Sequence, residues 1–190
     1  MKEFFYTGLM GAGKSERLIN MVENDESSFI VLNAVFDGET GRASTVTSRN
    51  GKSVQSIEIL SEHKTDDLKA LLYDIMMNQK VQTIYIDEIQ FLEPLQIEFI
   101  REYLSLLDIT IIYFGLETDF TGALFNATKY LIERLNHKQI MYIKRKCEIC
   151  DNEAEYNARI VNGEVAHSGE LFAEQKALYK ALCKKHYFSN

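Results

Sequence analysis

The stretch TGLMGAGKSERLI, residues 7–19, decides the fold because it carries the spacing of a phosphate-binding loop. Its pattern, G-x-x-x-x-G-K-[ST], begins at Gly8 and ends with Gly13, Lys14 and Ser15. In such a loop, glycines let backbone N–H groups turn towards phosphate oxygens, and the following helix points its positive N-terminus at them. The same residues could form an ordinary turn between a strand and a helix, so the flanking sequence has to distinguish the two.

The flanks supply the strand and the helix that a phosphate-binding loop requires. Phe4-Phe5-Tyr6 precedes the loop as a short apolar run, and residues 17–22 follow it in a helical pattern. We therefore predict a nucleotide site in which Lys14 reaches the β- and γ-phosphates and the Ser15 hydroxyl binds Mg²⁺.

Further apolar runs predict an α/β fold with a parallel sheet. They are continuous rather than alternating, as expected of strands that are covered on both faces. Helical patterns lie between them: one around residues 68–76 with Thr65 as its candidate N-cap, and one over residues 95–107 after Pro94. Residues 37–55 are polar and predict a long loop or a hairpin. The predicted strands after the first are residues 29–32, 83–86, 109–114 and 140–143.

The composition excludes several classes of protein. A net charge of −7 argues against a general nucleic-acid-binding surface, which is normally basic. No apolar stretch approaches the roughly 18 residues of a membrane span, and the beginning of the chain lacks a secretory signal. Three cysteines in 190 residues do not indicate a disulfide framework. We expect a cytoplasmic protein with one domain and a small appendage after about residue 145.

A pair of carboxylates follows the predicted strand at residues 83–86. In a parallel-sheet nucleotide site, a carboxylate for the metal stands at the carboxyl end of a neighbouring strand. Asp87 fits this role as a partner of Mg²⁺, which leaves Glu88 to activate water or to accept a proton from a substrate hydroxyl. The alternative is a solvated acidic turn.

Two pairs with x₂ spacing, Cys147/Cys150 and Cys183/His186, use every cysteine of the chain. Together they supply the four ligands of a closed tetrahedral Zn²⁺ site, which would connect the two ends of a long loop. The alternative is a set of reduced, buried cysteines with a surface histidine. The nearby run Lys-Arg-Lys at residues 144–146 is followed closely by acidic residues, and we interpret it as a solvated charge cluster.

Four motifs, in this order and spanning nearly the whole chain, resemble those of the zinc-containing thymidine kinases (type II). The pattern G-x-M-x-[SA]-G-K-[ST] is matched by residues 8–15, with Met10 in register. D-E-x-Q-F is matched by residues 87–91. G-L-D-T-D-F-x-G-x-x-F is matched by residues 115–125 with Glu117 in place of the aspartate, and C-x-K-H-Y by residues 183–187.

The resemblance implies a RecA-like kinase domain, residues 1–144, and a zinc-binding lobe, residues 145–190, whose lasso loop covers the nucleoside. It implies a homotetramer that uses ATP, Mg²⁺ and thymidine, with Glu88 as the general base on the 5′-hydroxyl and with Ser15 and Asp87 at the Mg²⁺. The implied ATP-binding residues are Gly8, Leu9, Met10, Gly11, Ala12, Gly13, Lys14, Ser15, Asp87, Glu88 and Gln90. The implied thymidine-binding residues are Met10, Phe91, Leu116, Phe120, Phe125, Tyr156, Asn157 and Tyr179.

Besides Glu117, the chain departs from the family pattern at two further places. Asn33-Ala34 stands where the family often has Lys-Pro, and the lasso is longer, with residues 170–178 after Ser168-Gly169. A deoxynucleoside kinase with a different base preference is therefore an alternative. An alternative of another class is a nucleotide switch whose zinc lobe binds partners. Arg49 matches the family's Ser-Arg-x-Gly loop and either adds positive charge to the site or is solvated.

Overall fold

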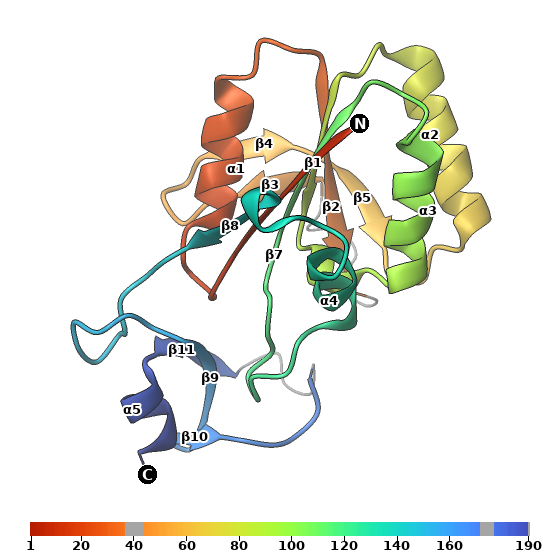
Figure 1. Ribbon diagram of the computed structural model, residues 1–190. Coiled ribbons are helices and arrows are strands. Elements are labelled where there is room, and N and C mark those ends of the chain that lie inside the picture. Colours follow the sequence, from red (N-terminus) through yellow and green to blue (C-terminus); the bar gives the residue numbers. More distant parts are fainter. Residues whose placement is uncertain (37–43, 172–176, 190) are drawn as a thin grey trace.

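The continuous apolar runs form one parallel sheet in the computed structural model, which describes residues 1–36, 44–171 and 177–189. Six strands lie in the order β5-β2-β6-β7-β1-β8, so the strand before the phosphate-binding loop is in the interior of the sheet (Figure 1). Every pairing in this sheet is parallel. The strands are β1 (Lys2–Gly8), β2 (Phe29–Val35), β5 (Ile57–Leu60), β6 (Thr83–Asp87), β7 (Thr110–Gly115) and β8 (Ile140–Ile143).

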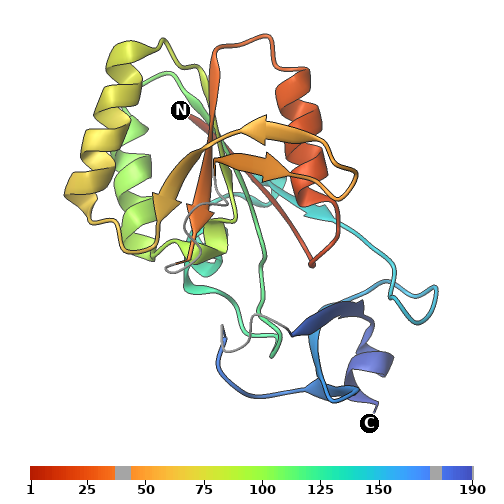
Figure 2. The same cartoon turned by 180° about the vertical axis from the view of Figure 1, so that it is seen from behind.

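Helices cover both faces of the sheet, as Figures 1 and 2 show. One face carries α2, α3 and α4, and the other carries α1 with the hairpin of β3 and β4. Strand β6 shows why its sequence is apolar throughout: Ile84 and Ile86 join the core on the first face, and Tyr85 joins the core on the second. The elements are α1 (Lys14–Glu23), β3 (Thr45–Thr47), β4 (Ser53–Gln55), α2 (Thr65–Asn78), α3 (Pro94–Leu104) and α4 (Asn126–Ile132), with short 3₁₀ helices η1 (Ile89–Phe91) and η2 (His137–Gln139).

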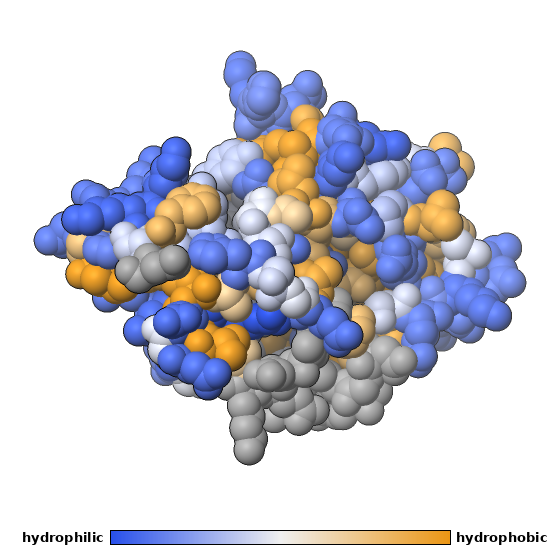
Figure 3. All heavy atoms as spheres, turned by 90° about the horizontal axis from the view of Figure 1, so that it is seen from below, coloured by the Kyte–Doolittle hydropathy of each residue, from blue (hydrophilic) through white to orange (hydrophobic). Residues whose placement is uncertain are grey.

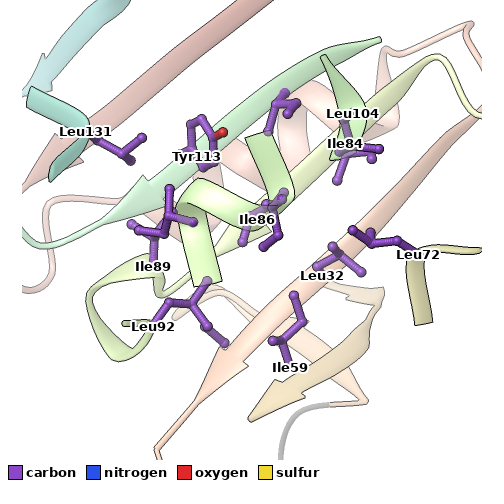
Figure 4. Close-up of a cluster of buried hydrophobic side chains, with 14 of the residues drawn as sticks. Leu32, Ile59, Leu72, Ile84, Ile86, Ile89, Leu92, Leu104, Tyr113 and Leu131 are labelled. Carbon is purple, nitrogen blue, oxygen red and sulfur yellow. The ribbon is translucent and has the colours of Figure 1, made fainter. Parts of the chain in front are cut away.

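The larger core packs the central strands against α2 and α3. Figure 4 shows Ile84 and Ile86 of β6 among side chains from neighbouring strands and helices, and both are fully buried. Ile89 and Leu92, which follow β6, reach the same core. The segment that carries the carboxylates after β6 is therefore fixed to the core on both sides of Glu88.

The predicted strands are confirmed, and three details of the prediction were wrong or incomplete. Thr65 is the first residue of α2, and Lys64 is its N-cap, so the helix begins one residue earlier than predicted. The Lys64 backbone N–H donates to the Asp67 carboxylate at 2.9 Å and so stabilises this start. Helix α3 ends at Leu104, three residues short of the expected end. Strand β5 was not predicted at all. The polar segment contains the β3–β4 hairpin, while residues 37–43 lie outside the described residues.

Residues 145–171 and 177–189, here called the C-terminal lobe, form a small antiparallel unit. Its three strands lie in the order β10-β9-β11 beyond the carboxyl ends of the central strands. On the face seen in Figure 3, hydrophobic side chains form scattered patches among hydrophilic ones. Among the described residues, no helix combines the length and the apolar character that crossing a membrane requires. The elements are β9 (Tyr156–Val161), β10 (Glu164–Ala166), β11 (Leu178–Leu182) and α5 (Lys184–Phe188).

Candidate active site

The phosphate-binding loop joins β1 to α1, which begins at Lys14. Gly11 and Gly13 have φ angles of 68° and 90°, a region that favours glycine, so the loop needs glycine at both positions. The Lys14 ammonium is buried and donates to the carbonyl oxygens of Gly8 and Leu9, each at 3.1 Å. Burial lowers the pKa of Lys14, and the carboxylates of Glu88 and Asp87 oppose this shift. The loop thus encloses a cation opposite two carboxylates.

Asp87 lies at the carboxyl end of β6, next to the loop. The Ser15 hydroxyl donates to its Oδ2 at 3.4 Å, as expected for two neighbouring ligands of one metal ion. Burial, followed by repulsion from Glu88, raises the pKa of Asp87 to about 7. A divalent cation would favour the ionised form, and hydroxyl and carboxylate oxygens are ligands that Mg²⁺ accepts. Ser15 and Asp87 therefore offer two adjacent oxygen atoms of the kind that Mg²⁺ accepts, and their role at Mg²⁺ stays a prediction.

Glu88 has a strained backbone and an oriented side chain. Its φ is 52°, in the left-handed region that side chains other than glycine rarely adopt. Such strain costs on the order of 1–3 kcal/mol and persists where the surroundings hold the residue in place. The Glu88 N–H donates to Asp87 Oδ1 at 3.0 Å, and the Gln90 side-chain amide donates to Glu88 Oε2. The carboxylate is thus held at a defined position beside the loop.

A cavity of about 520 Å³ connects the loop with Glu88. The hairpin forms one of its walls and is held to α1 by the Asn50 amide, which donates to Glu16 at 3.0 Å, and by a Lys52–Glu23 ion pair at 2.7 Å. The cavity brings the ends of β1, β2, β6 and β7 together. Its lining residues are Met10, Gly11, Gly13, Lys14, Ser15, Glu16, Asn33, Ala34, Val35, Thr47, Ser48, Arg49, Glu88, Gln90, Phe91 and Leu116.

A second cavity, of about 560 Å³, shares Gln90 and Phe91 with the first. It extends away from the phosphate-binding loop and is lined by residues 90–93, by the segment that leads into α4, including Phe125, and by Leu171 of the C-terminal lobe, among others. The two cavities together offer space for one ligand that extends from the phosphate-binding loop past Phe91.

The four ligands predicted for zinc converge in the C-terminal lobe. The sulfur atoms of Cys147, Cys150 and Cys183 and a ring nitrogen of His186 all lie within 4.8 Å of one another. His186 Nδ1 is 3.5 Å from the sulfurs of Cys147 and Cys183, and the sulfurs of Cys150 and Cys183 are 3.8 Å apart. Tetrahedral zinc, with Zn–S and Zn–N distances of about 2.3 and 2.0 Å, separates its ligands by about 3.5–3.8 Å. The cluster fits zinc.

Hydrogen bonds to the Cys147 sulfur also favour the thiolate form of this one ligand. Burial alone would raise the pKa of Cys147, but backbone N–H groups outweigh it and lower the pKa to about 6. The N–H of Ile149 is one of them, 3.5 Å from the sulfur. Because zinc binds thiolates, this arrangement prepares Cys147 to act as a ligand.

The site and its motifs match one protein family. The sequence model described as thymidine kinase matches residues 2–187. The chain belongs to the thymidine kinase family. The resemblance inferred from the four motifs is thereby confirmed, and with it the expected enzyme class, a kinase that uses ATP. The parallel α/β sheet is confirmed by the structure, as is a C-terminal cluster that could bind zinc.

Relatives within the thymidine kinase family match almost end to end. A thymidine kinase of Bacillus subtilis subsp. natto is 38% identical over 191 residues, which cover 98% of this chain and 96% of the relative. A thymidine kinase of Pasteurella multocida (strain Pm70) is 32% identical over 192 residues, with the same two coverages. Among solved structures, the Pif1 helicase from Candida albicans aligns with a TM-score of 0.46 at 15% identity, over 76% of this chain and 36% of the helicase.

The residues predicted to bind thymidine lie in three places. Met10, Phe91 and Leu116 line the first cavity, and Phe91 and Phe125 line the second. Phe120 and Asn157 are buried and line neither cavity. The Asn157 amide donates to the Thr118 carbonyl at 2.9 Å, so this side chain links the C-terminal lobe to the segment after β7. The structure thus places Met10, Phe91 and Leu116 in the same cavity as several of the predicted ATP-binding residues.

The remaining two thymidine-binding candidates lie on strands of the C-terminal lobe. The Tyr156 ring stacks on Tyr187 with centroids 4.2 Å apart, on the side of the zinc ligands. Tyr179 is the register partner of Arg159 on the neighbouring strand, so the two side chains share one face of the small sheet. Residues 172–176, within the expected lasso loop, lie outside the described residues.

Arg159 is a site residue that the sequence analysis missed. Its guanidinium lies 3.8 Å from the centroid of the Phe120 ring, and it donates to the carbonyl oxygens of Ser168 and Glu170 at 3.1 and 2.7 Å. It therefore holds the beginning of the lasso segment against the loop that follows β7. The alternation of side chains along a strand was the available signal, because it places Arg159 on the same face as Asn157.

Arg145 was missed as well, because the run at residues 144–146 was interpreted as solvated. Lys144 and Lys146 do form surface ion pairs, with Glu153 at 2.9 Å and Asp151 at 2.8 Å, and their side chains are 71% and 73% exposed. The Arg145 side chain is only 20% exposed, and it donates to the Met10 carbonyl of the phosphate-binding loop. The interpretation is correct for the lysines and wrong for Arg145.

Replacing Gly115 by Ala should disturb the wall that both cavities share. A β-carbon there would lie 2.6 Å from Ile89 Cγ2 and 2.7 Å from the Gln90 side-chain oxygen, which accepts from the Leu116 N–H at 2.9 Å. Overpacking of this kind costs about 1–3 kcal/mol of folding free energy. We expect a lower melting temperature and a lower kcat/KM. Gly163→Ala, in a turn with open space around it, is the control: it should lower the melting temperature and leave kcat/KM unchanged. Equal kinetic effects of both changes would contradict the prediction.

Proposed function

We propose that this chain is a thymidine kinase that transfers the γ-phosphoryl group of ATP to the 5′-hydroxyl of thymidine, giving dTMP and ADP. The observation that carries the proposal is the single cavity that joins Lys14 and Ser15 of the phosphate-binding loop to Glu88. Family membership and the relatives' names support thymidine as the acceptor. In this reaction the bond from the 5′-oxygen to phosphorus forms, the bond from phosphorus to the β,γ-bridging oxygen breaks, and the hydroxyl proton leaves.

Each residue around the cavity has a separate role in phosphoryl transfer. Phosphoryl transfer depends mainly on positioning and on neutralising charge. Lys14 and the N–H groups of the loop hold the β- and γ-phosphates, and Ser15 and Asp87 hold the metal ion. A Mg²⁺ ion held there would neutralise part of the negative charge of the phosphates. Glu88 accepts the proton of the 5′-hydroxyl, and its orientation by Gln90 keeps its carboxylate directed at the acceptor.

The acceptor nucleoside occupies the space on both sides of Phe91. Its sugar lies in the first cavity beside Glu88, and its base lies between Phe91, Leu116 and Phe125 on the side of the second cavity. Residues of the C-terminal lobe close this side and exclude water, which would otherwise hydrolyse ATP. The longer segment between Ser168 and Tyr179 favours a second candidate, a deoxynucleoside kinase with a different base preference.

A phosphorylation assay with ATP and Mg²⁺ across thymidine, deoxyuridine, deoxycytidine, deoxyadenosine and deoxyguanosine tests the proposal. We expect thymidine to give the highest kcat/KM and dTMP as the product. A higher kcat/KM for another deoxynucleoside would replace the first candidate by the second. Slow ATP hydrolysis with no nucleoside product would refute both candidates and would favour a nucleotide switch.

The assignment to the thymidine kinase family also supports a proposal for the domains and the oligomeric state of the enzyme. We propose a kinase domain of residues 1–144 and a lobe of residues 145–190 held by one structural Zn²⁺. We further propose a cytoplasmic homotetramer that binds its small-molecule substrates and needs neither nucleic acid nor membrane. Light scattering coupled to size-exclusion chromatography measures the oligomer directly.

A further inference from the structure

Arg145 connects the C-terminal lobe to the phosphate-binding loop. It lies between β8 and Cys147, and its Nη1 donates to the carbonyl oxygen of Met10, 135 residues earlier in the chain. Its Nη2 forms an ion pair with Glu148 at 3.1 Å. A guanidinium has five N–H donors, so these two partners leave several donors for a further acceptor. The position of Arg145 beside the loop makes a phosphate group the nearest candidate.

Arg49 reaches the same place from the β3–β4 hairpin. A β-carbon on Gly11 would lie 2.8 Å from both terminal nitrogens of Arg49 and would also clash with Nη1 of Arg145. The two guanidinium groups therefore lie against one glycine of the loop. Burial is the main cause of the lowered pKa of Lys14, and the charges of Arg145 and Arg49 add to it. Three cations thus surround the loop of a protein whose net charge is −7.

The described residues only partly balance the charges of these two arginines. Among the residues that the structure describes, Arg49 has no hydrogen bond or ion pair, and Arg145 has one carboxylate partner. Like charges held close together repel one another, and an anion between them removes the repulsion. Arginine suits an anion of several oxygens because its planar fork can donate two parallel hydrogen bonds. The nucleotide's polyphosphate is such an anion.

We propose that Arg145 is a polyphosphate-binding residue, which together with Arg49 holds the phosphates of the donor nucleotide over Gly11. The inference rests on the proposed kinase function, because the same loop receives the donor. It also gives the C-terminal lobe a part in binding ATP, in addition to any part in covering the acceptor nucleoside.

Arg145 could also act only by holding the backbone of Met10, without contacting phosphate. The backbone of Met10 is held twice from the C-terminal lobe, by Arg145 at its carbonyl and by Asn157 Oδ1, which accepts from its N–H at 2.7 Å. In a planar trans peptide, the carbonyl and the next N–H point in opposite directions. By fixing the Met10 carbonyl, Arg145 thus also orients the Gly11 N–H. A neutral donor could do this, whereas a phosphate clamp needs the positive charge.

The test measures binding of ATP, ADP and AMP by isothermal titration calorimetry. Arg145→Gln keeps a side-chain N–H donor and loses the charge, Arg145→Lys keeps the charge, and Arg145→Ala keeps neither. We expect Ala and Gln to raise the Kd of ATP by about tenfold or more, Lys to recover part of the loss, and AMP binding to change least. Wild-type affinity in Arg145→Gln would overturn the proposal and leave Arg145 a holder of the Met10 peptide.

The matched control is Lys144→Gln, which removes the same charge from the adjacent, exposed position. It should bind ATP like the wild type, and a tenfold loss here too would overturn the proposal by showing that net charge alone is responsible. Zinc content and far-ultraviolet circular dichroism of each variant report whether the lobe has folded. A wild-type protein that binds no ATP would refute the proposed function itself, whereas ATP binding that is insensitive to Arg145 would refute only this inference.

Discussion

Glu88→Gln should reduce the rate of thymidine phosphorylation by about 100-fold or more, the range expected when a general base is removed. Glutamine has the same shape and cannot accept the proton of the 5′-hydroxyl. The hydrogen bond from the Glu88 N–H to Asp87 uses the backbone and survives the change, so the Asp87 carboxylate keeps this partner. We therefore expect the Kd of ATP to stay close to that of the wild type. Single-turnover kinetics and calorimetry measure the two quantities.

Glu102→Gln is a suitable control, because it makes the same chemical change at an exposed position of α3. It should leave both the rate and ATP binding unchanged. Undiminished phosphorylation by the Glu88→Gln enzyme would remove Glu88 as the base. A parallel loss of ATP binding would instead show that the carboxylate supports the donor site.

The purified enzyme should contain about one zinc ion per chain, and Cys183→Ala should reduce this to a small fraction. The ligands come from two segments more than thirty residues apart, so zinc closes the lobe and its binding energy becomes folding energy. Zinc-finger peptides gain about 10–16 kcal/mol from such binding. We expect the variant to lose the fold of the C-terminal lobe and nearly all kinase activity. Inductively coupled plasma mass spectrometry and thermal melting measure these effects.

His167→Ala separates loss of the metal from loss of a histidine in the same lobe. His167 is exposed and lies outside the metal cluster, although its ring contacts Tyr187 and Phe188. We expect this variant to melt slightly earlier and to keep its zinc. Wild-type protein with far less than one equivalent of zinc would contradict the assignment of the four ligands.

The sequence allowed the central sheet and the chemistry of the loop to be predicted, because both depend on local patterns. Continuous apolar runs define strands that are covered on both faces, and glycine, lysine and serine at fixed spacing define a phosphate-binding loop. Strand β5 was not predicted, because it lacks such a continuous apolar run. It has four residues, alternates with a glutamate, and lies at the edge of the sheet, where one neighbour is sufficient.

The contacts between the lobe and the loop could not be predicted, since their partners carry no sequence signal. Arg145 and Asn157 bind the backbone of Met10, and backbone atoms are present at every residue. Arg145 also stands between two lysines that are solvated, so its neighbours in sequence pointed to the wrong environment. Such pairings become visible only once the fold brings distant segments together.

The double attachment of Met10 has a consequence for the order in which the enzyme matures. The ribosome makes Met10 135 residues before Arg145 and 147 residues before Asn157, the two residues whose side chains hold its backbone. Domains generally form as they emerge during synthesis, so the sheet can assemble while its nucleotide cradle still lacks these two anchors. The nucleotide site is therefore complete only after the C-terminal lobe has been synthesised and has folded against the loop.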